Sequence, residues 1–371
     1  MKPDILSLAA EAAQEFAIYG EFESVAPFGG GHINETCLSQ WNQGGITVRY
    51  THQRINHTIF LHPDEVMYNI NRVTSHIKAK LQAAGEKDWT RRVLTVVPAK
   101  DGKLFVRDRE GGWWRTYLFI EKCHTQDITS SPQEARLLGK SIGNFQKQLA
   151  DLDQPRLHDT IPDFHNMRKR YTRFYKALSE DPKGRAKEVR AEIDFMKENE
   201  ERGGILIDSL LGGKIPERIT HNDTKMNNIL IDDKDGSILG VLDLDTVMPG
   251  TVLFDVGDLI RTVTTRAEED ECDLSKVVFD LDFFEGLLGG YISEALEFLT
   301  ENEKALLAES GRNLTHIMGL RFLTDYLEGD VYYNIKRPSH NIDRCRNQIA
   351  LIKSMDAQWE KARQTAEKLC S

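Results

Sequence analysis

The feature of this sequence that most restricts its fold is a change of pattern near residue 122. Up to that point the chain consists mainly of short β-like runs separated by Gly-rich or Asp-Gly turns, with one helix inserted at residues 63–84. From about residue 131, apolar residues recur at helical spacing, and one strand pair at residues 229–245 interrupts the helices. We therefore predict an α+β chain of two lobes, residues 1–122 and 123–371.

Length and charge exclude several classes of partner. The chain has 371 residues and a formal net charge of −10. An acidic chain without a basic block is not expected to bind nucleic acid or an anionic membrane surface as its main partner. The apolar runs are too short to span a bilayer. We expect a small-molecule partner, and a polyanion such as ATP would need a local cationic pocket, usually with a metal ion.

The cysteines and the first residues indicate the compartment. The number of cysteines is odd and none form a CxxC pattern; they are Cys37, Cys123, Cys272, Cys345 and Cys370. This favours reduced thiols in a cytoplasmic protein, without structural disulfides or zinc. Asp4, Glu11 and Glu15 interrupt the apolar N-terminal stretch, which therefore predicts an amphipathic helix and not a signal peptide.

The stretch ITHNDTKMNNILID, residues 219–232, places many polar side chains between apolar ends, without Gly, Pro or Ser. Within it Asn228 follows Asp223 by five residues, and the next strand runs into Asp243. Phosphoryl transfer needs a carboxylate near the acceptor hydroxyl, and an amide oxygen and a second carboxylate for magnesium. We therefore predict that Asp223 is the base, that Asn228 binds Mg²⁺, and that Asp243 bridges Mg²⁺ and the phosphates.

A polar loop followed by a strand-end acid that caps the next segment is the alternative interpretation. A single His-x-Asp is common, but HxDxxxxN followed by a hairpin and an apolar-flanked Asp is much more specific, which favours the catalytic interpretation. Asp243 and Asp245 lie two residues apart and would share a face of a strand, so either could coordinate the metal. Lys225, two residues after Asp223, could neutralise the transferring phosphate.

A glycine cluster near the N-terminus predicts a nucleotide-binding loop. Gly29, Gly30 and Gly31 let a hairpin backbone lie close to phosphates, with N–H groups directed at them. Asn34 stands where the last glycine of GxGxxG would be, and there is no GK[ST] ending, so the segment is not a P-loop. A plain turn is the alternative, but the position before a strand, a helix and the catalytic loop favours nucleotide binding.

Together these motifs resemble the aminoglycoside phosphotransferase-like kinases, and in particular their N-acetylhexosamine 1-kinase branch. The segments that carry the resemblance span almost the whole chain: FGGGHINET, QRINHTIF, IPDFH, HNDTKMNN, VLDLDTVMPG, DVGDLIR, RFLTDYLEGDVYY and RCRNQIALI. The resemblance implies a protein-kinase-like two-lobe fold, with a β-rich N-terminal nucleotide-binding lobe and a helical lobe for catalysis and acceptor binding. It also implies ATP and Mg²⁺ as cofactors.

The resemblance implies supporting roles for several residues. Kinases of this fold use a strand cation, usually Lys, near the α- and β-phosphates. Here only Arg49 and Arg54 are available on that strand, and Arg54 lies in the resembling stretch QRIN, so it is our predicted phosphate contact. Asp255 is expected to steady the catalytic loop, and His221 to brace it. The match favours Asp243 over Asp245 as the metal ligand.

For the acceptor, the resemblance points to His32, Arg321 and Tyr332. Arg and His can donate to hydroxyls and to an acetamide carbonyl, and an aromatic ring can stack on a pyranose. The implied reaction is ATP-dependent phosphorylation of the anomeric 1-OH of an N-acetylhexosamine (GlcNAc or GalNAc) to the sugar 1-phosphate. The alternative is a kinase for another hydroxyl acceptor, such as a different sugar, an aminoglycoside or an amino alcohol. A non-catalytic pseudokinase is disfavoured because the base and both metal ligands are present.

Overall fold

The computed structural model describes residues 4–29, 33–126 and 129–371, and the chain divides into two compact units. The first unit comprises Met1–His124, Asp151–Pro162 and Leu230–Met248. The second comprises Thr125–Ala150, Asp163–Ile229 and Pro249–Ser371. The sequence-based division falls at residue 122, close to the end of the first segment, but it leaves out the two later segments that complete the first unit.

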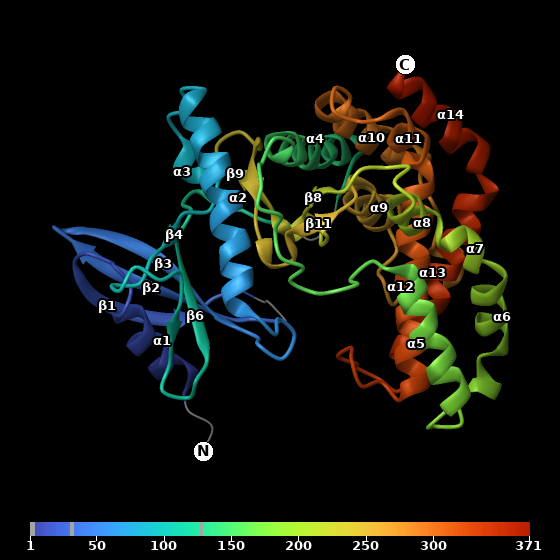
Figure 1. The fold of residues 1–371 in the computed structure, drawn as a ribbon, viewed down its shortest axis with the longest axis horizontal. Coiled ribbons are helices and arrows are strands. Elements are labelled where there is room, and N and C mark those ends of the chain that lie inside the picture. The colour runs from blue at the N-terminus through green and yellow to red at the C-terminus, as the bar shows by residue number, and fades with distance from the viewer. Residues whose placement is uncertain (1–3, 30–32, 127–128) are drawn as a thin grey trace. The chain divides into compact units, whose positions relative to one another are not determined.

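An antiparallel sheet forms the body of the first unit (Figure 1), with the strand order β1-β2-β3-β6-β4 and with β5 also paired to β6. Its strands are β1 (Glu21–Pro27), β2 (Glu35–Gln43), β3 (Ile46–Ile55), β4 (Val96–Val97), β5 (Val106–Arg107) and β6 (Trp113–Leu118). The turn from β2 to β3 passes through Gly44 and Gly45, at φ 66° and 89°. Glycine adopts these angles without steric cost, which explains why this turn can be recognised in the sequence.

Three helices and a small second sheet complete the first unit. The helices are α1 (Ile5–Gln14), α2 (Pro63–Ala83) and α3 (Trp89–Arg92), and the sheet has the order β10-β9-β7. Its strands are β7 (Cys123–His124), β9 (Ile229–Asp232) and β10 (Ile238–Val241). The side chain of Asp4 caps α1, and Pro63 at the first turn of α2 with Asp64 and Glu65 explains where that helix begins.

One buried amide joins three distant segments of the first unit. Asn69, on α2, is fully buried, and its Nδ2 donates to the carbonyl oxygens of His158 (2.8 Å) and Val247 (2.9 Å). Its Oδ1 accepts from the N–H of His158 (3.0 Å). The segment that carries Asp243 and Asp245 is therefore fastened to α2 at Val247.

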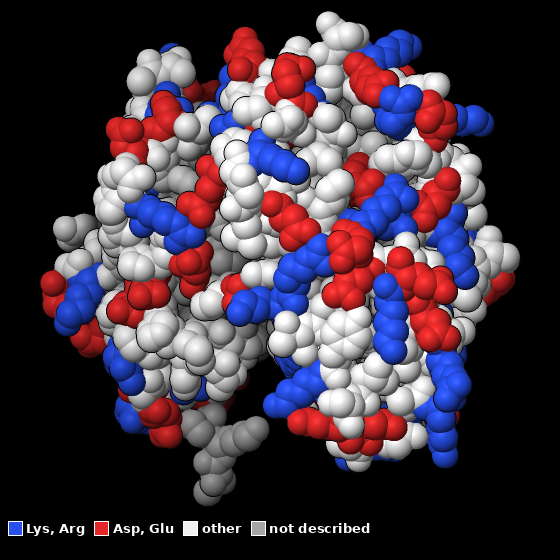
Figure 2. Space-filling view, turned by 45° about the vertical axis from the view of Figure 1, so that its right-hand side comes forward, with Lys and Arg blue, Asp and Glu red and all other residues white. Residues whose placement is uncertain are grey.

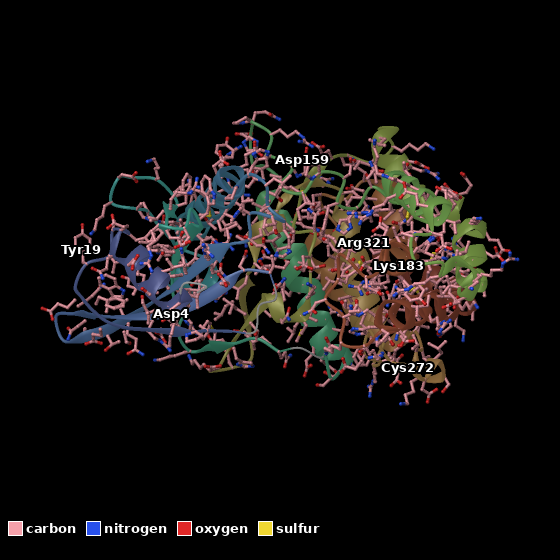
Figure 3. The ribbon with its side chains drawn as sticks, turned by 90° about the horizontal axis from the view of Figure 1, so that it is seen from below. Asp4, Tyr19, Asp159, Lys183, Cys272 and Arg321 are labelled. Atoms are coloured by element: carbon pink, nitrogen blue, oxygen red, sulfur yellow. The ribbon has the colours of Figure 1, made fainter. Side chains whose placement is uncertain are left out.

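The second unit is mainly helical (Figures 1 and 3). Its α-helices are α4 (Pro132–Leu149), α5 (Met167–Glu180), α6 (Arg190–Glu198), α7 (Glu200–Gly203), α8 (Ile205–Leu211), α9 (Val252–Val263), α10 (Leu281–Ala295), α11 (Glu301–Ala305), α12 (Leu307–Glu328), α13 (His340–Ala357) and α14 (Trp359–Cys370). The short elements of this unit are β8 (Arg218–Thr220), β11 (Met248–Gly250) and the 3₁₀ turns η1 (Ala186–Glu188), η2 (Met226–Asn228) and η4 (Leu274–Lys276). A further 3₁₀ turn, η3 (Leu244–Thr246), belongs to the first unit.

Close helix contacts explain some of the glycines in this unit. A Cβ at Gly290 of α10 would lie 1.8 Å from the Arg136 carbonyl oxygen of α4, and one at Gly139 would lie 2.0 Å from the Leu287 oxygen. The two helices can approach so closely only because these side chains are missing.

The surface carries side chains of both charges. On the face shown in Figure 2, acidic and basic side chains are interspersed over the surface. None of the helices in the described ranges is long and apolar enough to cross a membrane. The five cysteines are free thiols.

We expect Asn69→Ala to lower the free energy of unfolding by about 2–3 kcal/mol, because the buried backbone groups of His158 and Val247 would lose their partners. Asn71→Ala, on the same helix and partly exposed, is the matched control and should change stability by less than about 0.5 kcal/mol. Chemical denaturation of both variants is the measurement. Equal effects at the two positions would contradict the role given to Asn69.

Candidate active site

A buried carboxylate fixes the backbone of the loop that carries Asp223. Asp255, on α9, is fully buried, and its two oxygens accept from the backbone N–H groups of His221 (3.0 Å) and Asn222 (2.7 Å). Gln146 Nε2 also donates to it (2.8 Å). Burial raises the pKa of the Asp255 carboxyl, whereas these three hydrogen bonds favour its ionised form. The contacts support the structural role expected for Asp255, since they reach the loop and not a ligand surface.

Two histidines brace the same loop. His221 Nδ1 accepts from the backbone N–H of Asp223 (3.3 Å), and His165 Nε2 contacts the carbonyl oxygen of Asn222 (3.1 Å). Burial lowers the pKa of His165 to about 3, so the ring is neutral and its Nε2–H donates to that oxygen. Asn222 has a left-handed backbone (φ 66°), which turns the chain just before Asp223.

Asp223 itself is partly open to solvent. Its side chain is 22% exposed, and Oδ1 lies 2.8 Å from Lys225 Nζ. Asn228 is buried, and its Nδ2 donates to the carbonyl oxygen of Asp223 (2.9 Å). Because the amide nitrogen is used in this way, the amide oxygen is the atom of Asn228 that a cation could bind. Lys225 pairs with the carboxylate, where it can also meet an approaching phosphate.

The two acids after β10 do not share a face, contrary to the sequence-based expectation. The strand ends at Val241, and Asp243 has φ 55° and ψ 59°, after which the 3₁₀ turn η3 begins. A left-handed residue breaks the two-residue alternation of a strand. Asp243 is exposed as a result, whereas Asp245 is buried at 3% exposure. Such a backbone conformation in a residue other than glycine is common at functional sites.

The oxygens of Asp245 are occupied by protein donors. Arg115, on β6, forms a buried ion pair with Oδ1, and Asn34 Nδ2 donates to Oδ2 (2.6 Å). Arg115 also donates to Gln53 Oε1 (3.0 and 2.8 Å), and Asn34 Oδ1 accepts from the N–H of Asn56 (2.9 Å). Asp245 therefore anchors its segment to the sheet, which favours Asp243 as the metal ligand. Asn34, expected to contact the nucleotide, uses both ends of its amide within the protein.

The cation paired with Asp245 is Arg115, whereas Arg54, the predicted phosphate contact, lies on the opposite face of the sheet. Gln53 pairs with Arg115 across β3 and β6, so the two side chains share a face, and Arg54 points to the opposite one. Arg54 Nε lies 2.9 Å from Asp108 Oδ2, which ties β3 to the turn between β5 and β6. The signal that could have found Arg115 is its place in WWRTYL, since a buried strand tolerates an arginine only beside a buried acid.

Only part of the predicted glycine loop can be examined. Gly29 has φ 75°, a conformation that favours glycine. Gly30, Gly31 and His32 lie outside the described residues, so their expected contacts with phosphate and acceptor stay predictions.

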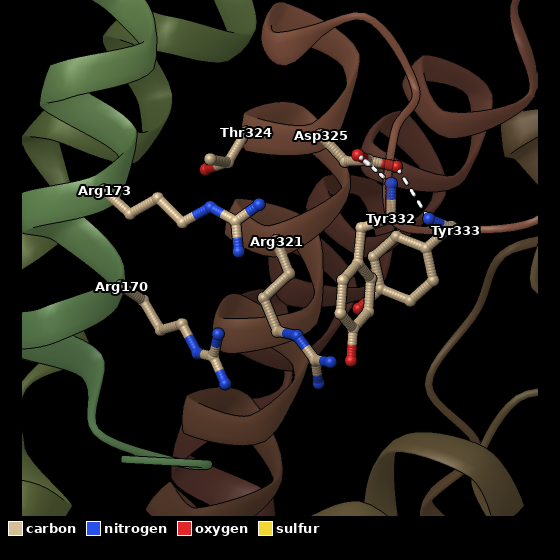
Figure 4. Close-up of a pocket in the computed structure, with 7 residues that line it drawn as sticks. All are labelled: Arg170, Arg173, Arg321, Thr324, Asp325, Tyr332 and Tyr333. Atoms are coloured by element: carbon tan, nitrogen blue, oxygen red, sulfur yellow. Dashed lines mark hydrogen bonds between the residues drawn. The ribbon is translucent and has the colours of Figure 1, made fainter. Parts of the chain in front are cut away.

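Arg321 and Tyr332, the other two predicted acceptor contacts, come together in one pocket of the second unit (Figure 4). The pocket opens to solvent and is lined by Arg170, Arg173, Arg321, Thr324, Asp325, Tyr332 and Tyr333. The Arg321 guanidinium lies 5.3 Å from the ring centre of Phe164 and 5.8 Å from that of Tyr332. Phe164 precedes His165, whose Nε2 contacts the carbonyl oxygen of Asn222 beside Asp223. Sequence reasoning missed Arg170 and Arg173, although MRKRYTRF concentrates cations on one helix.

Magnesium suits the residues assigned to it. No group of three or more His, Cys, Asp or Glu side chains within the described ranges is placed to hold a metal ion. Mg²⁺ commonly uses one or two protein carboxylates together with phosphate oxygens and water. The exposed carboxylate of Asp243 and the amide oxygen of Asn228 are hard oxygen ligands of that kind.

We expect Arg115→Met to lower the free energy of unfolding by about 3–5 kcal/mol, because Asp245 would remain as an unpaired buried charge. The matched control is Arg49→Met, which breaks a pair with Glu121 whose side chains are 34% and 49% exposed, and this should change stability by less than about 1 kcal/mol. Thermal and urea unfolding would measure both. Similar small losses in the two variants would show that the buried pair does not anchor the Asp243 segment.

Several solved structures share this fold. A spectinomycin phosphotransferase in complex with ADP and spectinomycin is 15% identical, with a TM-score of 0.50, covering 98% of this chain and 97% of that one. An ethanolamine kinase of Plasmodium vivax is 13% identical (TM-score 0.56; 90% and 84% covered), and a choline kinase of Cryptosporidium parvum is 12% identical (TM-score 0.56; 99% and 100% covered). These similarities confirm the predicted α+β, protein-kinase-like fold, with an N-terminal antiparallel sheet and a larger helical part.

The family follows from the sequence itself. Residues 24–287 match the model of the family described as "Phosphotransferase enzyme family". The match includes the glycine cluster, the catalytic loop, the hairpin with Asp243, and Asp255. This chain belongs to the phosphotransferase enzyme family.

Proposed function

We propose that this protein transfers the γ-phosphoryl group of ATP to a hydroxyl of a small polar molecule. The observation that carries the proposal is the setting of Asp223: a partly exposed carboxylate on a loop whose backbone is fixed by the buried Asp255. A carboxylate held in this way can orient an acceptor hydroxyl and take its proton. Family membership supports the same reaction class.

The other residues of the proposed site position the reacting groups and neutralise their charge. Asn228 and Asp243 are the proposed Mg²⁺ ligands, and the metal, when bound, would neutralise charge on the phosphates. Lys225 balances the charge of Asp223 and can move to the transferred group, because its side chain is half exposed. Arg115 acts indirectly, since its pair with Asp245 fixes the turn that presents Asp243. In such a site most of the acceleration comes from positioning and electrostatics.

The proposed nucleotide contacts are the backbone N–H groups of the Gly29–Gly31 loop. Gly29 supports this role through its left-handed backbone, which lets the chain turn where phosphates would lie. Arg54 is a weaker candidate than the sequence implied, because Asp108 and Glu35 both lie within ion-pair distance of it.

A sugar is the proposed acceptor, and the anomeric 1-OH of an N-acetylhexosamine is the specific candidate that the sequence resemblance supplies. The pocket that joins Arg321 and Tyr332 supports a sugar, because guanidinium groups donate to hydroxyls and an exposed aromatic ring can stack on a pyranose. Structures with a similar fold include phosphotransferases named for spectinomycin, ethanolamine and choline, which support a wider range of hydroxyl acceptors. The arginines of the pocket disfavour the cationic members of that range.

Asp223→Asn should lower kcat by about 10²–10⁴-fold, because the amide cannot accept the hydroxyl proton. ATP affinity should stay near the wild-type value, since Asp223 is not proposed to bind the nucleotide. Steady-state kinetics and nucleotide titration are the measurements. The control is Asp194→Asn, an exposed acid on α6, which should be fully active. Near-normal turnover of Asp223→Asn would refute the assignment of the base.

An acceptor panel tests the substrate class. GlcNAc, GalNAc, an unmodified hexose, an aminoglycoside and choline would be compared with ATP and Mg²⁺. We expect turnover on sugars and little or none on the two cationic acceptors, and loss of reducing-end reactivity would identify phosphorylation at C1. Preferred turnover of choline or the aminoglycoside would contradict the sugar assignment. Mg²⁺-dependent ATP binding without turnover on any acceptor would favour the pseudokinase alternative.

A further inference from the structure

We propose that the pocket between α5 and α12 binds an oxyanion, a carboxylate or a phosphate group carried by the acceptor, through Arg170 and Arg321. The acceptor would then be an acidic hydroxyl compound, such as a sugar acid or a sugar phosphate, in place of the neutral N-acetylhexosamine that the sequence resemblance supplies. The oxyanion site follows from the pocket alone, and only the statement that the anion belongs to the acceptor rests on the proposed kinase function.

The charge in this pocket is not balanced. Figure 4 shows the guanidinium groups of Arg170 and Arg173 extending from α5 toward Arg321 on α12. Arg173 is paired with Glu328, with N–O distances of 2.8 and 2.6 Å. In the part of the chain that the structure describes, neither Arg170 nor Arg321 has a carboxylate within ion-pair distance. Two of the three cations therefore lack a counter-ion.

The hydrogen-bond acceptors of these two arginines are neutral groups. Arg170 Nη2 donates to the carbonyl oxygen of Phe164 (2.7 Å), and its Nε is buried without a hydrogen-bond partner among the described residues. Arg321 Nη1 contacts only the sulfur of Met318 (3.4 Å) in the same set of residues. A buried N–H without a partner is unfavourable, and a guanidinium binds oxyanions with several charge-assisted hydrogen bonds. Both arginines thus retain donors for a ligand.

The one acid that lines the pocket does not neutralise them. Asp325 Oδ1 accepts from the backbone N–H groups of Val331 (2.9 Å) and Tyr332 (2.8 Å), and Oδ2 accepts from that of Tyr333 (3.0 Å). Asn341 Nδ2 also donates to it (2.8 Å). The carboxylate holds the two tyrosines at the pocket wall, as the dashed lines in Figure 4 mark, so its oxygens hydrogen-bond neutral donors and form no ion pair with Arg170 or Arg321.

The electrostatics within the pocket also favour binding of an anion. Burial, and next the positive charge of Arg321, lower the pKa of Arg170 to about 10. Two like charges that are partly desolvated repel each other, and an anion between them relieves the repulsion. Arginine is suited to this task because its planar fork matches the oxygens of a carboxylate or phosphate.

The aromatic residues orient one of the two cations and leave the site accessible. Arg321 lies over Phe164, Tyr332 and Tyr333, at 5.3, 5.8 and 5.4 Å from the ring centres. Tyr332 is 50% exposed, so a ligand can reach this end of the pocket. Phe164, over which Arg321 lies, is followed by His165, whose Nε2 contacts the carbonyl oxygen of Asn222 next to Asp223.

The test compares matched neutral and acidic sugars. Glucose, glucuronate and glucose 6-phosphate would be titrated by calorimetry into the full-length protein without nucleotide. We expect at least one acidic sugar to bind about tenfold or more tightly than glucose, a difference that charge-assisted hydrogen bonds typically supply. Preference for glucuronate identifies a carboxylate site, and preference for glucose 6-phosphate a phosphate site. Equal binding of acidic and neutral sugars would overturn the proposal.

Variants of α5 assign the effect to the pocket. Arg170→Gln should remove the preference for the acidic sugar, and Arg170→Lys, which keeps the charge, should retain part of it. Arg168→Gln is the matched control, because it removes an arginine from the same helix that is paired with Asp208 outside the pocket (2.5 Å). Melting temperatures would show that the variants are folded. An unchanged preference in Arg170→Gln, or an equal loss in Arg168→Gln, would overturn the proposal.

Measurements of turnover distinguish a failure of the anion site from a failure of the proposed kinase function. With ATP and Mg²⁺ present, preferred phosphorylation of the acidic sugar supports both. Turnover of glucose with no preference for the acidic sugars overturns the anion site and leaves the kinase assignment intact. Binding of the acidic sugar that depends on Arg170, without turnover on any acceptor, supports the anion site and removes the kinase assignment.

Discussion

The hydrogen bonds between the buried carboxylate of Asp255 and two successive backbone N–H groups are the contact on which the rest of the candidate site depends. A loop that carries a reactive acid must be held in one geometry, but it cannot be covered by packing without losing access to its substrate. Asp255 meets both requirements. It fixes His221 and Asn222 through hydrogen bonds to their main chain, and it leaves the side chain of Asp223 partly exposed. Burial raises the pKa of Asp255, and the hydrogen bonds that its oxygens accept oppose that shift.

The same arrangement recurs at two other acids. Asp325 uses its oxygens to hold the backbone that carries Tyr332, and Asp245 is held between Arg115 and Asn34. In each case a buried acid is satisfied by the protein, and a neighbouring residue is exposed to solvent: Tyr332 in the pocket, and Asp243 beside its own turn. The structure thus separates anchoring acids from those that can serve chemistry, which explains why a plain count of acidic residues near the motif does not identify the reactive ones.

The pocket between α5 and α12 brings arginines together without matching carboxylates. Within the described ranges, Arg170 and Arg321 line the open space without a carboxylate partner. Desolvated like charges are unfavourable in an empty pocket, and such a cost is usually maintained only where a ligand repays it.

The sequence by itself determined the elements and the catalytic loop. Helical and strand periodicity predicted α2 and the β9–β10 hairpin, because these patterns are local, and the spacing of Asp223 and Asn228 marked the reactive loop for the same reason. Only the tertiary structure decided what depends on neighbours distant in sequence. It placed the hairpin in the first unit and turned Asp243 away from Asp245 by a left-handed residue. It also paired Asp245 with Arg115 across 130 positions and brought α5 against α12 to form the arginine pocket, since burial and charge pairing are set by packing and not by local pattern.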